Sequence, residues 1–244
     1  MCRLLGFVSN SAVTIQDLGG SDLADFIKLS EFHKDSWGLA LIDGENSLLE
    51  KRVESAASSP SFTQVLRDRF AKGGLLHFRW ASPGIEVTDE NAHPFTHGDI
   101  AFIHNGSLKP YDTLISEIPE SFLALRKGTG DSELFFLMSL AHIESEGFVA
   151  GVLKTVRKIK MNHSFSSINS MFLNSDYLVV VAEHHPENKP DWAEDSYYEL
   201  KFRVDSAGIL VSSSGWNQAD WLDIPNHSAL IVDRKTLKTE LVPL

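Results

Sequence analysis

The pattern of hydrophobic and polar residues changes period along this chain. Residues 3–8 are almost continuously apolar, which predicts a short strand buried on both faces. A helical period follows from Ser21 to about Phe32, and the residues on its apolar face are Leu23, Phe26, Ile27 and Phe32. Residues 37–42 and 47–53 then flank a polar turn at 43–46, which predicts a β-hairpin.

The next segments predict a helix and then two strands. Ser59-Pro60 is typical of a helix start, and a helical period continues through Phe70 towards Gly73-Gly74. Residues 75–81 alternate bulky apolar and polar side chains and predict a strand. Residues 99–104 predict another strand, which leads directly into Asn105-Gly106.

The second half of the chain is first helical and then strand-rich. Helices are predicted over residues 110–125, with an interruption at Pro119, from about residue 131, and over residues 147–161. After them the period becomes two, and strands are predicted at 167–173, 176–183, 197–204, 209–214, 228–233 and 239–242. Neither a repeat nor a low-complexity linker divides the chain, so we predict a single domain over residues 1–244.

Charge and composition exclude several classes of function. The 244 residues carry 33 acidic against 22 basic side chains, a net charge of −11, which disfavours binding to nucleic acid or to an anionic membrane. No apolar stretch reaches the roughly 18 residues of a membrane span, and no signal peptide is recognisable. The single cysteine cannot form an internal disulfide. Together these features predict a protein of the reducing cytoplasm.

That single cysteine is Cys2, directly after the initiator methionine. If Met1 is removed, Cys2 carries a thiol and a free α-amine on one Cα. Their reference pKa values are about 8.5 and about 8, so a proton passes between them at little cost and each group activates the other. The alternative is that Cys2 is a small buried hydrophobe, the usual role of a lone cysteine.

Other polar residues have ordinary structural explanations when each is considered alone. Arg79 fits a half-exposed strand arginine, Asn105-Gly106 is the commonest hairpin signal, and Asp131 fits a helix N-cap. His184-His185 lie in a polar loop, 184–195, but no further ligand stands at a recognisable metal-binding spacing. We therefore predict neither a metal site nor a cofactor.

Taken together, the motifs indicate a family. In order they are Met1-Cys2-Arg3, His77-Phe78-Arg79-Trp80-Ala81-Ser82, His93-Pro94, His104-Asn105-Gly106 and Gly130-Asp131-Ser132-Glu133. This ordered set resembles the class II glutamine amidotransferases of the N-terminal nucleophile hydrolase superfamily, and their stand-alone, single-domain members most of all. The resemblance implies an α+β fold, a four-layer αββα sandwich with the nucleophile at the end of the first strand.

The resemblance also implies residue roles. Cys2 would attack the side-chain amide of glutamine or a related γ-glutamyl compound, and the Asn105 side chain and the Gly106 N–H would form the oxyanion hole. Arg79 would bind the substrate α-carboxylate and Asp131 the α-ammonium, and Trp80 and Ser82 would belong to the same substrate pocket. His77 and Trp80 would support the pocket without reacting. Ser82-Pro83 departs from the pattern of the sugar-phosphate-making relatives, which weakens the expectation of further carboxylate contacts there.

The sequence is compatible with three alternatives for the role of the protein and for the acceptor of any released ammonia. One alternative is a separate synthase subunit that docks and takes it, and another is a free-standing hydrolase of γ-glutamyl amides or peptides. A third is a catalytically silent module that binds glutamine-like ligands. The sequence is equally compatible with a monomer and with a homo-oligomer.

Overall fold

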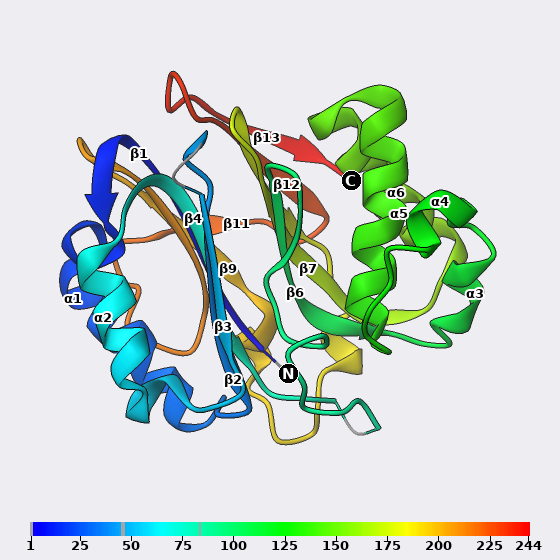
Figure 1. Cartoon of the computed structure of the whole chain (residues 1–244), viewed down its shortest axis with the longest axis horizontal. Helices are drawn as coiled ribbons and strands as arrows, with labels where there is room; N and C mark the ends of the chain where they lie inside the picture. Colours follow the sequence, from blue (N-terminus) through cyan, green and yellow to red (C-terminus); the bar gives the residue numbers. More distant parts are fainter. Residues whose placement is uncertain (1, 45–46, 83) are drawn as a thin grey trace.

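The computed structural model describes residues 2–44, 47–82 and 84–244. Within these residues, the strands form two antiparallel sheets that pack face to face, and helices cover the outer face of each sheet (Figure 1). The layers follow the order helix, sheet, sheet, helix. This arrangement confirms the predicted αββα sandwich.

One sheet contains seven strands in the described part of the chain. In spatial order they are β11 (Leu222–Ile224), β9 (Leu200–Val204), β10 (Gly208–Ser213), β1 (Arg3–Thr14), β4 (Phe70–Arg79), β2 (Ser36–Leu41) and β3 (Leu48–Arg52). The first strand is therefore central, and neighbours pair along both of its edges. β2 and β3 are the predicted hairpin, although residues 45 and 46 of its turn lie outside the described residues.

The other sheet contains six strands among the described residues. Their order is β13 (Thr239–Pro243), β12 (Ser228–Asp233), β8 (Tyr177–Ala182), β7 (Phe165–Leu173), β6 (Ile100–Leu108) and β5 (Phe95–His97). β5 and β11 were not predicted from the sequence, because three residues are too few to show a period.

Two groups of helices complete the sandwich. α1 (Ile15–Lys28) and α2 (Pro60–Asp68) cover the seven-stranded sheet, and α5 (Asp131–Glu146) and α6 (Phe148–Asn162) cover the six-stranded sheet (Figure 1). Short pieces are α3 (Asp112–Ile115), α4 (Glu120–Leu123) and the 3₁₀ turns Leu29–Glu31, Ala56–Ser58, Pro186–Asn188 and Asp195–Tyr198. None of the helices in the described ranges is both long and apolar enough to cross a membrane.

The start of α1, predicted at Ser21, and the ends of α1 and α2 differ from the sequence prediction. α1 begins at Ile15 and ends at Lys28, and Phe32, predicted on its apolar face, is 69% exposed. α2 ends at Asp68, so Phe70 is the first residue of β4 and not a helical residue. In both places the apolar period runs past the residue where the chain leaves the helix.

Side-chain alternation places the functional candidates between the two sheets. On β1, Leu4 and Val8 face the core between the sheets, so Cys2 belongs to the same face. Leu75 on β4 and Ile103 on β6 also face this core, which puts Arg79 and Asn105 on the inner faces of their strands.

Candidate active site

Cys2 lies at the mouth of the central strand. Arg3 on β1 pairs with Phe78 on β4, so Cys2 is next to the residues that follow Phe78. Its Sγ is 3.8 Å from the carbonyl oxygen of Trp80. The side chain is largely buried yet contributes to the wall of a narrow pocket.

Asn105 joins Cys2 across the gap between the sheets. The Cys2 backbone nitrogen donates a hydrogen bond of 2.9 Å to Asn105 Oδ1. Asn105-Gly106 is not a hairpin turn here, because both residues lie inside β6 and pair with Asn169 and Ile168 of β7. The pairing of two long strands thus overrides the local turn preference of the dipeptide.

Gly106 is required by a close approach of two backbones. A Cβ atom built at this position would lie 1.8 Å from the carbonyl oxygen of Ser167, far inside van der Waals contact. The hydroxyl of the same Ser167 donates to the Asn105 carbonyl oxygen at 2.9 Å. Because Gly106 has no side chain, Ser167 can come close enough to make this hydrogen bond, which holds Asn105 in position.

Arg79, at the end of β4, is buried and only partly paired. Its Nη2 donates to the Glu86 carbonyl oxygen at 3.0 Å, whereas Nη1 is buried without a hydrogen-bond partner among the described residues. Burial lowers the pKa of the guanidinium, and negative charge on Cys2 and Asp35 acts in the opposite direction. The pocket therefore contains a cation with a free donor.

Asp131 is the first residue of α5, and Gly130 occupies the N-cap position. Its Oδ2 accepts from the Leu108 N–H at 2.7 Å, and its Oδ1 accepts from the Ser132 N–H at 2.9 Å. These two bonds fix the carboxylate between the end of β6 and the start of α5. Each oxygen retains further capacity to accept a hydrogen bond.

The pocket brings the predicted site residues together. Its lining includes Cys2, Arg79, Trp80, Ser82, Gly106 and Asp131, and Asn105 is bonded to the Cys2 backbone beside it. His77 does not line it. That ring is fully buried behind the pocket, with Nε2 3.2 Å from the His104 carbonyl oxygen.

Several lining residues were given no role in the sequence prediction, and two of them, Asn91 and His104, make polar contacts there. Asn91 Oδ1 accepts from the N–H groups of Thr129 and Gly130, at 2.9 and 3.2 Å, so it ties the loop before β5 to the start of α5. His104 Nδ1 is 2.9 Å from Ser132 Oγ. His104 belongs to one recognised motif and Asn91 precedes another, yet only the folded chain shows that both face the pocket.

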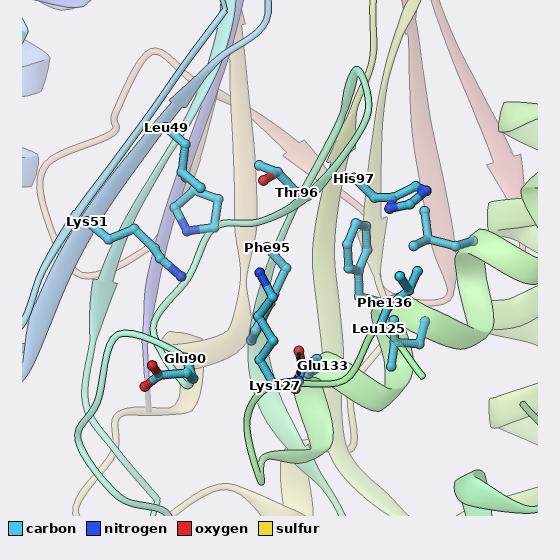
Figure 2. Close-up of a pocket in the computed structure, with 13 residues that line it drawn as sticks. Leu49, Lys51, Glu90, Phe95, Thr96, His97, Leu125, Lys127, Glu133 and Phe136 are labelled. Atoms are coloured by element: carbon cyan, nitrogen blue, oxygen red, sulfur yellow. Dashed lines mark hydrogen bonds between the residues drawn. The ribbon is translucent and has the colours of Figure 1, made fainter. Parts of the chain in front are cut away.

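A second pocket lies between β3 and α5 and shares Phe95 with the first (Figure 2). Two of its charged residues are bonded to the backbone. Lys51 Nζ donates to the carbonyl oxygens of Asp89 and Ala92, and the Glu133 carboxylate accepts from the N–H groups of Lys127 and Gly128. These contacts stabilise loops, and no cysteine is among the described residues that line this pocket.

Buried histidines near the site make folding sensitive to acid. Burial lowers the pKa of His77 to about 3 and the pKa of His93 well below its ordinary value of 6.5. Both rings are therefore neutral in the folded protein near neutral pH. In the unfolded chain they take up protons near pH 6.5, so between that pH and about 3 the unfolded state binds more protons.

We expect a lower free energy of unfolding at about pH 5 than at about pH 7. The contribution of these histidines is complete above pH 6.5 and is lost as pH falls, by about 2 kcal/mol at pH 5 for each ring that stays neutral when folded. Urea unfolding at both pH values measures it. A variant of the exposed His97, His97→Gln, should show the same loss as the parent, and equal stability at both pH values would contradict the prediction.

Comparison with known proteins places this chain in a family. Residues 1–189 match the model of the class II glutamine amidotransferases. A glutamine–fructose-6-phosphate aminotransferase of Aquifex aeolicus is 32% identical over 176 residues, which cover 69% of this chain and 27% of that protein. An uncharacterized protein of Methanocaldococcus jannaschii is 26% identical, over 95% of this chain and 69% of its own length.

Among solved structures, a glutamine aminotransferase class-II domain protein of Silicibacter pomeroyi superposes with a TM-score of 0.69 at 17% identity, covering 100% of this chain and 99% of its own. This likeness concerns the fold. The chain spans 27% to 39% of the length of three aminotransferases that it matches. Because the family match covers most of the chain, the protein belongs to the class II glutamine amidotransferases.

Proposed function

We propose that this protein hydrolyses the side-chain amide of glutamine or of a related γ-glutamyl compound through a thioester on Cys2. The observation that carries the proposal is that the Cys2 thiol shares one pocket with a buried cation, Arg79, and a fixed carboxylate, Asp131. Opposite charges beside a nucleophile suit an α-amino acid head group and do not suit an apolar acyl chain.

The first step requires an α-amine on Cys2, and we propose that Met1, which lies outside the described residues, is removed. The thiolate then attacks the amide carbonyl carbon, and the α-amine transfers the proton to the departing nitrogen. The contact of 2.9 Å between Cys2 N and Asn105 Oδ1 supports this step. The same contact would hold the α-amine in place beside the sulfur.

Negative charge that develops on the carbonyl oxygen needs donors. The Oδ1 end of Asn105 is engaged by Cys2, which leaves its Nδ2 end as the donor for the oxyanion, with the Gly106 N–H as the second. Loss of one such donor typically costs about 2.7–4 kcal/mol of barrier. Water then hydrolyses the thioester and releases glutamate.

The contacts to the substrate head group follow from the hydrogen-bonding capacity that Arg79 and Asp131 have left after their contacts within the protein. The unpartnered Nη1 of Arg79 is a donor for the substrate α-carboxylate. The Asp131 carboxylate, held by two backbone N–H groups, can accept a further hydrogen bond from the α-ammonium. Trp80 and Ser82 would form the adjoining wall.

Two other candidate functions differ in whether this chain must form the covalent intermediate on Cys2. If the protein supplies ammonia to a separate synthase subunit, its own glutaminase reaction is still expected to proceed without that partner. If it is a silent module that binds glutamine-like ligands, Cys2 forms no covalent intermediate. Retention of Cys2, Arg79, Asn105, Gly106 and Asp131 in one place favours an active enzyme.

An intact-mass measurement tests the proposal. The purified chain is expected to lack Met1 and to gain one adduct on treatment with 6-diazo-5-oxo-L-norleucine, an electrophile with the α-amino acid head group of glutamine. Peptide mapping should place the adduct on Cys2. A chain that retains Met1 and gains no adduct would contradict the proposed function.

A further inference from the structure

A larger cavity lies on the other side of Trp80 from the Cys2 pocket. Its volume is about 420 Å³, and Trp80 belongs to the walls of both spaces. Part of its lining comes from Trp192, in the loop at residues 184–195, and part from Phe32, after α1. Neither residue belongs to the site described above.

Aromatic rings open onto this cavity. Trp80 and Trp192 stack nearly parallel, with ring centroids 5.1 Å apart and an angle of 18° between the planes. Trp192 is 57% exposed and Phe32 is 69% exposed, so both retain apolar surface in contact with solvent. Several large exposed aromatic side chains around one concave site are typical of a binding surface.

The same cavity contains polar atoms without partners. Arg3 Nε, His33 Nε2 and Tyr197 Oη are buried and have no hydrogen-bond partner among the described residues, and all three side chains are more than nine-tenths buried. The Arg3 guanidinium also lies over the Tyr197 ring, 4.0 Å from its centroid, and a polar ligand group at this lining would be the partner that the three atoms lack.

The chemical character of these atoms restricts that partner. His33 Nδ1 lies 2.8 Å from the Leu29 carbonyl oxygen and so carries the proton, which leaves Nε2 as an acceptor. Burial lowers the pKa of His33 to about 3, so the ring is neutral near neutral pH. Arg3 Nε is a donor, and the Tyr197 hydroxyl is both donor and acceptor. The cavity therefore suits a ligand with an aromatic ring and with both donors and acceptors.

The position of the cavity relates it to Cys2. Under the proposed function, the head group lies at Arg79 and Asp131, and the bond that breaks lies at the Cys2 sulfur. Cys2 Sγ contacts the Trp80 carbonyl oxygen, and the Trp80 side chain, which is 38% exposed, lines both spaces. A substituent on the departing nitrogen that passes over Trp80 would enter this space.

Resting on that function, we propose that the cavity binds the amine portion of the substrate, and that the preferred substrates are γ-glutamyl amides whose amine carries an aromatic ring. Cys2 sulfur bonds to the γ-carbonyl carbon, the carbon–nitrogen bond breaks, and the nitrogen takes a proton from the α-ammonium to leave as a primary amine. Water then cleaves the thioester, which yields glutamate and restores the thiol. The sum is one amide and one water converted to glutamate and one amine.

Three substrates test this inference on the full chain: glutamine, γ-L-glutamyl-L-alanine and γ-L-glutamyl-L-tyrosine. We expect kcat/KM for the tyrosine dipeptide to exceed that for the alanine dipeptide by at least about tenfold. Trp192→Ala and Phe32→Ala should each remove most of this ratio and leave kcat/KM for glutamine within about twofold. The matched control is Phe70→Ala, an exposed phenylalanine at the opposite end of β4, which should change none of the three values.

The outcomes separate the two proposals. Hydrolysis of glutamine with equal kcat/KM for the two dipeptides would overturn the substrate preference and leave the proposed function standing, as would be found if the aromatic surface served only a docking protein. A preference that survives both Trp192→Ala and Phe32→Ala would overturn the assignment to this cavity. Failure to hydrolyse all three substrates, with no adduct on Cys2, would overturn the proposed function itself.

Discussion

Replacement of Cys2 by alanine is expected to lower the hydrolysis of glutamine by at least about 10³-fold and to leave the fold intact. Without sulfur, no thioester can form, and the remaining site can only bind substrate. Alanine fits because the thiol is buried and, among the described residues, its hydrogen-bond contact is the weak one to the Trp80 carbonyl oxygen. Alanine is also small enough for Met1 to be removed, so processing is unchanged.

The measurement is steady-state release of glutamate, with circular dichroism and thermal unfolding as checks on the fold. Cys2→Ser provides a comparison, because it replaces the thiol by a hydroxyl, keeps the α-amine and alters only the reacting atom. Appreciable turnover by well-folded Cys2→Ala would refute the role of Cys2 as nucleophile.

Replacement of Arg79 by alanine is expected to raise KM for the γ-glutamyl substrate by about 10- to 100-fold, since a charge-assisted hydrogen bond contributes about 1.5–3 kcal/mol. Reaction of Cys2 with iodoacetamide, a reagent without an α-carboxylate, should slow far less. Arg79→Lys retains the charge but not the planar fork, so KM should stay raised.

The control for general effects of removing an arginine is Arg52→Ala. Arg52 is on β3, three strands from β1, and is half exposed, so both assays should be unchanged. An equal loss in the two assays for Arg79→Ala would show that Arg79 acts on the thiol and not on the substrate head group.

Much of the layer order could be predicted because the strands and the long helices contain enough residues to display their period. The lengths of the elements were harder to predict. Phe32 and Phe70 continue an apolar period beyond Lys28 and Asp68, where the helices end, because nothing local distinguishes an apolar residue in a helix from one just after it. Both side chains are exposed, so packing against the sheet, and not the period, decides where the covered face of each helix ends.

The candidate site shows the same division between local and distant causes. Asn105-Gly106 is typical of a turn, but pairing with β7 and the contact of Gly106 with Ser167 keep both residues extended inside a strand. The ordered motifs could identify the residues that share a pocket. They could not identify Asn91, whose partners Thr129 and Gly130 lie 38 and 39 positions away along the chain.

The position of Cys2 on a central strand has a practical consequence for producing the protein. Pairing on both sides of β1 leaves the start of the chain between two neighbours, and Cys2 N is already engaged by Asn105. An affinity tag ahead of Cys2 would occupy the amine that the proposed reaction needs and would crowd the pocket. The other terminus, Leu244, follows the edge strand β13 and lies away from the N-terminus (Figure 1), so it is the suitable place for a tag or a surface linkage.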